Sequence, residues 1–174
     1  MSLCCYTCTI VLYILAAFII ICFGFVILRG APYVPSHRRQ LHLALTELYP
    51  LSAHDTLVDL GSGDGIVLRT ARRLGARAIG YELNPLLVLL SRMISVGDRQ
   101  LIVRMKDYSR VVKLPEDVTV VYAFTTSHSI EAIGRMMQRW STDRPLYLIS
   151  YGFMLKDQQP VRRKGPMTLY KFGG

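Results

Sequence analysis

A glycine turn flanked by acidic residues stands out within the segment TLVDLGSGDGIVLRTARRLGARAIGYELNP, residues 56–85. The residues of the turn that could meet a ligand are Asp59, Gly61, Ser62, Gly63, Asp64 and Gly65. Alternating glycines permit positive φ angles and remove the Cβ atoms that would keep a ligand away from the backbone. The apolar run before the turn predicts a strand and the residues after it predict a helix, whose N-terminal N–H groups would point at the ligand.

A further carboxylate, Glu82, ends the second predicted strand of this segment. It follows Asp59 by 23 positions (82 − 59). At about this spacing a carboxylate on the second strand of a nucleotide-binding βαβ unit meets ribose hydroxyls. The segment therefore predicts a βαβ unit that binds a nucleotide-like ligand at the carboxyl ends of its strands.

The two acidic side chains of the turn indicate which ligand it takes. Glycine-rich turns also bind dinucleotides and phosphates, so the glycines alone do not decide. Asp59 and Asp64 would repel a diphosphate but suit a ligand that carries a sulfonium and an α-ammonium group. S-adenosylmethionine carries both, and we expect it as the cofactor. The alternative is that these two carboxylates only cap the turn and the start of the helix.

Three segments together resemble a known family: PYVPS at 32–36, VDLGSGDG at 58–65 and GYELNPLLVLLSR at 80–92. VDLGSGDG and GYELNP resemble the first two motifs of class I S-adenosylmethionine-dependent methyltransferases. All three segments resemble the membrane-anchored protein-lysine methyltransferases that act on the ATP synthase c subunit and on the adenine nucleotide translocase, and their bacterial relatives. The resemblance covers most of residues 32–125. It implies a membrane-anchored protein-lysine N-methyltransferase that acts on a membrane protein.

The resemblance implies a set of cofactor-binding residues: Asp59, Gly61, Ser62, Gly63, Asp64, Gly65, Tyr81, Glu82, Asn84 and Asp107. Asp107 follows the third predicted strand, where class I methyltransferases place an acidic side chain that accepts a hydrogen bond from the adenine amino group. The alternative for Asp107 is a solvated acid in a loop.

Phe124, Thr125 and Thr126 lie at the carboxyl end of the fourth predicted strand. In the family this position borders the methyl group and the incoming nucleophile, so we expect Phe124 and Thr125 to position the acceptor. The residues differ from the Asn-Pro-Pro-Tyr or Asp-Pro-Pro-Tyr pattern of methyltransferases acting on nucleobases and glutamine, which disfavours that substrate class. His128 could act as a base, but a histidine beside a helix start more often caps or packs.

An acceptor lysine has to lose its proton first, because its unperturbed pKa is about 10.4. We expect Tyr122 and Phe124 to form an apolar mouth in which desolvation favours the neutral amine. The sequence also leaves open a methyltransferase for a lipid headgroup or a small hydrophobic molecule. A module that binds the cofactor or nucleic acid without catalysis is a further alternative, which the intact motifs disfavour.

No metal site is expected. His37, His42 and His54 show no metal-ligand spacing. The four cysteines lie within the first 22 residues, in or beside an apolar segment without histidine or acidic partners. Packing as small apolar side chains is the simpler interpretation.

Residues 3–28 contain no Asp, Glu, Lys or Arg. As a helix these 26 residues (28 − 3 + 1) would be about 39 Å long, against roughly 30 Å of bilayer hydrocarbon. We therefore expect one uncleaved transmembrane helix. A cleaved signal peptide is the alternative, but it needs a basic n-region, a shorter apolar core and a small-residue cleavage site.

Charge predicts the orientation of the chain. Arg29, Arg38 and Arg39 follow the apolar segment and no basic residue precedes it, which places the later domain on the cytoplasmic side. We expect the bacterial plasma membrane, with the mitochondrial inner membrane as the alternative. The net charge of +9 belongs to the residues after position 28 and suits an anionic lipid surface. Charge alone does not separate lipid from nucleic acid, which we expect not to be the partner.

Strands and helices are predicted in alternation along the rest of the chain. Strands are expected at 56–60, 78–82, 101–105, 118–124 and 145–152, and helices at 65–74, 84–96 and 129–140. This alternation indicates an α/β fold, a Rossmann-like sheet with helices on both faces. A leading helix capped by Ser36 should cover one edge of the sheet, and MTLYKF at 167–172 should add an edge strand. The expected divisions are an anchor at 3–28, a linker and leading helix at 29–55 and the methyltransferase domain at 56–174.

Overall fold

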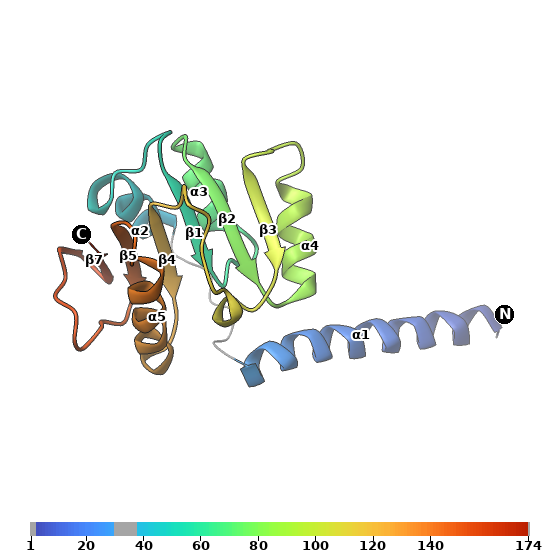
Figure 1. Cartoon of the computed structure of the whole chain (residues 1–174). Coiled ribbons are helices and arrows are strands. Elements are labelled where there is room, and N and C mark those ends of the chain that lie inside the picture. The colour runs from blue at the N-terminus through green and yellow to red at the C-terminus, as the bar shows by residue number, and fades with distance from the viewer. Residues whose placement is uncertain (1–2, 30–37, 174) are drawn as a thin grey trace.

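The computed structural model of this protein describes residues 3–29 and 38–173. A long helix, α1 (Leu3–Arg29), is followed by one seven-stranded sheet with helices packed on it (Figure 1). The PYVPS segment and the predicted helix cap Ser36 lie outside the described residues.

The strands lie in the order β3-β2-β1-β4-β5-β7-β6 across the sheet. Their bounds are β1 (Thr56–Leu60), β2 (Arg77–Glu82), β3 (Leu101–Met105), β4 (Val120–Phe124), β5 (Leu146–Tyr151), β6 (Arg162–Lys164) and β7 (Met167–Phe172). β1 to β5 pair in parallel, whereas β7 runs antiparallel to both β5 and β6. The order of the strands reverses between β1 and β4. In an open α/β sheet a ligand binds beyond the carboxyl ends of the strands at such a reversal.

Helices cover both faces of the sheet, as predicted. One face packs against α2 (Arg38–Leu43), the π-helix η1 (Ala44–Leu48), α3 (Ile66–Arg73) and α4 (Pro85–Ile94). The other face packs against α5 (Ser127–Trp140) and the segment around Val111 and Leu114 that follows the short 3-10 helix η2 (Tyr108–Arg110). α5 buries Ile130, Ile133 and Met137 at helical spacing, so these residues form the side of the helix that packs on the sheet.

One expectation about the sheet is wrong. β7 is not an edge strand, because β6 pairs with it and forms the edge instead. The three residues of β6 are Arg162, Arg163 and Lys164, and all are exposed. The sequence therefore has no apolar pattern here that would predict a strand. Exposed basic side chains are a common means of protecting a sheet edge from further pairing.

The leading helix also lies elsewhere than predicted. It covers a face of the sheet and not an edge, since Leu41, Leu45 and Leu48 pack in one cluster with β-strand residues such as Leu57 and Ile149. Its regular part is short and continues as η1, which ends at Leu48.

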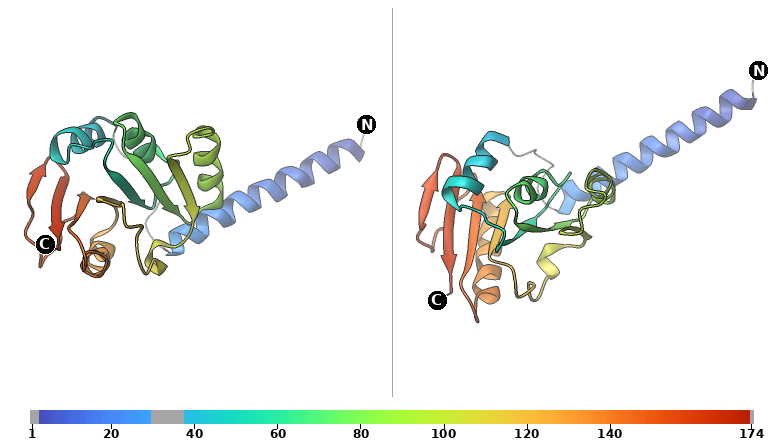
Figure 2. Two further views of the ribbon diagram at one scale, coloured as in Figure 1. Left: turned by 45° about the horizontal axis from the view of Figure 1, so that its top comes forward. Right: turned by 90° about the horizontal axis from the view of Figure 1, so that it is seen from above.

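α1 carries exposed side chains at every position from 6 to 21. Figure 2 shows it extending away from the sheet. Among residues 3–29 and 38–173, no helix was found that is long and apolar enough to cross a membrane. The predicted transmembrane helix is therefore not confirmed.

Candidate functional site

The glycine turn lies between β1 and α3, at the carboxyl ends of the parallel strands. Gly61, Gly63 and Gly65 all have positive φ angles, of 92°, 54° and 83°. The N–H groups of Gly61 and Ser62 donate to the carbonyl of Tyr81, at 2.9 and 3.0 Å, which joins the turn to β2. A Cβ atom at Gly61 would have no heavy atom within 4 Å, so this part of the turn is open to a ligand. A Cβ atom at Gly65 would collide with the Ser91 hydroxyl of α4.

Glu82 fastens the turn to the end of β2. Its Oε2 accepts from the Gly63 N–H at 2.8 Å. Its Oε1 accepts from the N–H groups of Leu83 and Asn84, at 2.7 and 2.8 Å. The residue is 7 % exposed. Because a carboxylate can accept about four hydrogen bonds, Glu82 keeps acceptor capacity for a ligand hydroxyl.

Asp59 is the most unusual carboxylate of the site. It is 2 % exposed, and no hydrogen bond to its side chain contributes to its pKa. Burial, and then the charges of Glu82 and Asp64, raise its pKa well above the ordinary value. A buried and unpaired carboxylate is costly, and a cationic ligand group placed beside it would remove that cost. The ammonium and sulfonium groups of S-adenosylmethionine fit this requirement.

Asp64 has structural partners of its own. Its Oδ1 accepts from the N–H of Ile66, in the first turn of α3, at 3.2 Å. Its Oδ2 lies 3.2 Å from the guanidinium of Arg69. The alternative interpretation, that the turn's acids cap the helix, therefore describes Asp64 and not Asp59.

Three buried polar atoms beside the turn lack a protein partner among the described residues. They are the hydroxyls of Ser62 and Ser91 and the side-chain nitrogen of Asn84. The Asn84 oxygen accepts from the N–H of Leu86 at 3.0 Å, so Asn84 is the N-cap of α4. Tyr81 is 2 % exposed, so its side chain packs in the core. Only its backbone carbonyl contacts the turn, by accepting from the N–H groups of Gly61 and Ser62. Unpaired polar atoms at this place fit a bound ligand or water.

The loop that follows β3 reaches the carboxyl end of β4. Asp107 is half-buried and accepts from the N–H and hydroxyl of Ser109, at 2.9 and 2.6 Å, so that it caps η2. Burial and the charge of Asp107 raise the pKa of Tyr108, and a hydrogen bond with Thr125 opposes them. Tyr108 thus brings Thr125, at the end of β4, next to the loop that carries Asp107.

Two aromatic rings pack against each other at the carboxyl ends of β4 and β5. The ring centroids of Phe124 and Tyr151 are 4.4 Å apart at an angle of 56°. The Tyr151 hydroxyl donates to the Gln40 side chain of α2 at 2.5 Å. Tyr122 does not line the expected apolar mouth, because it is 1 % exposed and packs among the core residues on the α2 face. Tyr151 takes that place, because the parallel register of β4 and β5 pairs it with Phe124, and the sequence alone does not fix this register.

The start of α5 lies beside this edge. Thr126 caps the helix by accepting from the N–H of Ser129. His128 is exposed. It borders a cavity of about 390 Å³ that also touches Tyr108, Glu131 and Lys156. Within residues 3–29 and 38–173, no group of three or more His, Cys, Asp or Glu side chains could hold a metal ion.

Comparisons with known proteins agree with this geometry. No family model matches the sequence. Over 61 residues the chain is 44 % identical to the lysine N-methyltransferase of the ATP synthase c subunit from Rattus norvegicus, and the match covers 35 % of this chain and 27 % of that protein. Over 63 residues it is 46 % identical to the adenine nucleotide translocase lysine N-methyltransferase of Mus musculus, and the match covers 36 % and 27 %. The chain spans about a quarter of the length of these curated relatives.

A solved structure extends the match over most of the chain. An RNA methyltransferase from Salinibacter ruber in complex with S-adenosyl-L-homocysteine is similar with a TM-score of 0.67 and 28 % identity, covering 80 % of this chain and 92 % of that one. The predicted resemblance to class I methyltransferases is confirmed. The predicted enzyme class, S-adenosylmethionine-dependent methyltransferase, and the predicted cofactor are borne out by the same relatives. The roles of individual residues stay predictions.

Proposed function

We propose that this protein transfers a methyl group from S-adenosylmethionine to the amine of a lysine on a membrane-associated protein. The observation that carries the proposal is the unpaired, buried carboxylate of Asp59 beside a glycine turn that Glu82 fastens. This arrangement offers negative charge and open backbone to a ligand with cationic groups. Lysine as the acceptor is supported by the names of both curated relatives, each of which is a lysine N-methyltransferase.

Transfer of this kind depends on alignment more than on acid–base catalysis. When bound, S-adenosylmethionine supplies a methyl group on a positively charged sulfur. The lysine nitrogen forms a bond to the methyl carbon as the carbon–sulfur bond breaks and its electron pair stays on sulfur; the methylated nitrogen then loses a proton to water. Phe124 and Tyr151 would exclude water around the amine, and desolvation favours its neutral form.

Transfer of a radiolabelled methyl group to native membranes tests the acceptor. Label in protein that yields N-methyllysine after hydrolysis is the expected result. Asp59→Asn should abolish most of the incorporation, while Asp55→Asn, at the other end of β1, should retain it. Label that separates with the lipid fraction would replace this proposal by a lipid or small hydrophobic acceptor.

RNA is the second candidate acceptor, and two observations favour it. The similar solved structure is an RNA methyltransferase. The net charge of +9 would also attract a polyanion. The last residue of β4 and the three that follow it, Phe-Thr-Thr-Ser, differ from the Asn-Pro-Pro-Tyr or Asp-Pro-Pro-Tyr pattern noted above, which counts against a nucleobase amine. Digestion of the labelled material with ribonuclease and with protease distinguishes the two acceptors.

We further propose that residues 3–28 attach the chain to a membrane, with the domain on the cytoplasmic side. The absence of charge in this segment and the exposed side chains of residues 6–21 support attachment. Arg29, Arg38 and Arg39 support the orientation. A bacterial plasma membrane is the expected location, with the mitochondrial inner membrane as the alternative. Extraction of membranes at alkaline pH should leave the chain in the pellet, and an impermeant thiol reagent should label Cys4 in intact cells.

A further inference from the structure

α4 carries apolar side chains on both of its sides. Leu87 and Val88 face the sheet and are at most 7 % exposed. The opposite side, which we call the α4 face, consists of Leu89 (56 % exposed), Leu90 (42 %), Met93 (63 %), Ile94 (53 %) and, just after the helix, Val96 (83 %). Contiguous exposed apolar side chains on a water-soluble surface mark an interaction site.

The α4 face differs from the outer sides of the neighbouring helices. α5 presents Arg135, Gln138 and Arg139 outward, and α3 presents Arg73. A helix that packs on a sheet normally shows such polar residues to solvent. The apolar residues of α4 recur at spacings of three and four, so they form one stripe along the helix.

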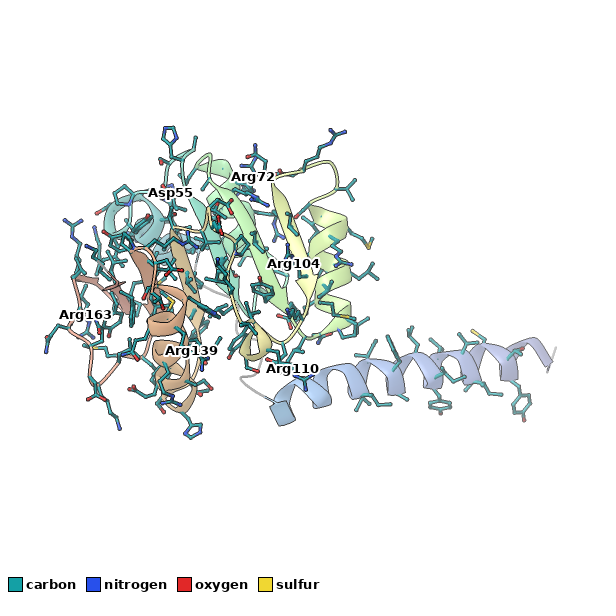
Figure 3. The ribbon with its side chains drawn as sticks, in the orientation of Figure 1. Asp55, Arg72, Arg104, Arg110, Arg139 and Arg163 are labelled. Carbon is teal, nitrogen blue, oxygen red and sulfur yellow. The ribbon has the colours of Figure 1, made fainter. Side chains whose placement is uncertain are left out.

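Cationic side chains border the α4 face. Residues 85–106 contain Arg92, Arg99, Arg104 and Lys106, with Asp98 as the one acid. Asp98 is paired with Arg72, at 2.8 Å. Arg99 and Lys106 are exposed. Arg104 is exposed too but points to the opposite face of the sheet, since it pairs in register with Tyr81 of the core on the α5 face. Figure 3 shows Arg104 at the β3 end of the sheet and Arg163 at the other edge. An apolar stripe bordered by basic residues is typical of a surface that lies in the interface of an anionic bilayer.

α1 extends from the same side of the domain. It is in contact with α4. In Figure 1 and in both views of Figure 2, α4 lies on the side of the sheet toward which α1 projects. The exposed apolar side chains of α1 and the α4 face therefore lie on the same side of the domain. One membrane could contact both.

We infer that the α4 face lies in the headgroup region of an anionic lipid bilayer and holds the domain against it. This inference rests on the membrane attachment proposed above but not on methyl transfer. α4 follows β2 directly, so its first residues lie at the carboxyl edge of the sheet, next to Glu82. Docking of this helix would hold the glycine turn and the ends of the strands close to the membrane surface.

Quenching of an added tryptophan by brominated lipid tests the contact. The full chain, without cofactor, is bound to vesicles of brominated phosphatidylcholine and phosphatidylserine and shown to float with them. Met93→Trp places the probe on the α4 face, and Val161→Trp is the matched control, since Val161 is also exposed (59 %) but lies beside β6 at the other edge of the sheet. The native Trp140 is buried and contributes equally to both.

The added fluorescence at position 93 should lose most of its intensity, and that at position 161 should lose none. Adding Leu89→Glu to Met93→Trp should restore at least half of the lost intensity, because a carboxylate would be repelled by the bilayer interface. Equal quenching at both positions, or quenching that Leu89→Glu does not change, would overturn the inference. A chain that floats but shows no quenching at position 93 would overturn it and leave the attachment standing. A chain that does not float would overturn both.

Discussion

Replacing Asp59 by Asn should strengthen the fold and weaken the binding of S-adenosylmethionine. Asp59 is buried, and its pKa is raised well above the ordinary 3.8 by burial and by the charges of Glu82 and Asp64. The folded protein therefore holds this proton more tightly than the unfolded chain. Between the ordinary and the raised pKa, the free energy of unfolding falls as the pH rises. Asn is close to Asp in shape and carries no charge, so the substitution removes this loss.

The magnitude follows from the surroundings of the carboxylate. Relief of a buried polar group without a partner is worth about 1–2 kcal/mol. For a domain of this size that raises Tm by about 3–8 °C at neutral pH. Loss of a charge-assisted contact to the ligand costs about 1.5–3 kcal/mol, so the affinity for S-adenosylmethionine should fall roughly 10- to 150-fold.

Thermal melts over a range of pH, together with calorimetry of cofactor binding, measure the two effects separately. In the wild type, cofactor affinity should increase as the pH rises through the pKa of Asp59. The stabilisation by Asp59→Asn should be large at neutral pH and disappear at acidic pH, where the wild-type carboxyl is also neutral. A lower Tm at neutral pH, or wild-type affinity in the variant, would refute the reasoning.

Asp55 provides the matched control, just before β1 at its opposite end. Burial would raise the pKa of Asp55, but hydrogen bonds from Thr119, Ser52 and Tyr49 outweigh it and hold the pKa below its ordinary value. Its contribution to stability is present above the ordinary pKa and is lost as the pH falls through the lowered one. Asp55→Asn should therefore cost about 1 kcal/mol of stability at neutral pH, allowing for its partial exposure, without a change in cofactor affinity.

Three further substitutions separate the parts of the site. Glu82→Ala should lower cofactor affinity roughly 10- to 150-fold and also lower Tm, because three backbone N–H groups lose their acceptor; calorimetry that shows unchanged binding would contradict this. Phe124→Ala should move the pH–rate profile of methyl transfer to higher pH and leave cofactor affinity unchanged, since a wetter acceptor site favours the charged amine; an unmoved profile would count against an apolar acceptor site. His128→Ala should retain most of the transfer rate because His128 is exposed at the start of α5, and a loss of two orders of magnitude would make it the general base.

The sheet and its helices could be predicted because the signals were local. Short β-branched runs alternate with helical spacings, and the turn before α3 has the glycines that its positive φ angles require. β6 could not be predicted in this way, since Arg162, Arg163 and Lys164 owe their strand conformation to pairing with β7. The placement of α2 and η1 on a face of the sheet depends likewise on packing against strands far along the chain.

The composition of the site was visible in the sequence, but the division of tasks among its carboxylates was not. Which acid remains unpaired depends on contacts made in three dimensions: Arg69 reaches Asp64, and the N–H groups of the turn reach Glu82. Asp59 is left as the carboxylate for a cation, although its position in the motif resembles that of the others. Tyr151 was missed because only the register of β4 with β5 sets it beside Phe124.

The chain itself limits how far the acceptor side of the site can lie from the N-terminal segment. α1 ends at Arg29 and α2 begins at Arg38, nine positions later. An extended chain covers at most about 3.5 Å per residue, so these two helix ends lie within roughly 32 Å of each other. Gln40, in the first turn of α2, bonds to Tyr151 at the end of β5, where the acceptor would enter. If α1 lies in a membrane, the reacting amine must lie within a few nanometres of the membrane surface. A lysine near the membrane boundary of an embedded protein meets this condition without any further domain to present it, which is the acceptor that the proposed function requires.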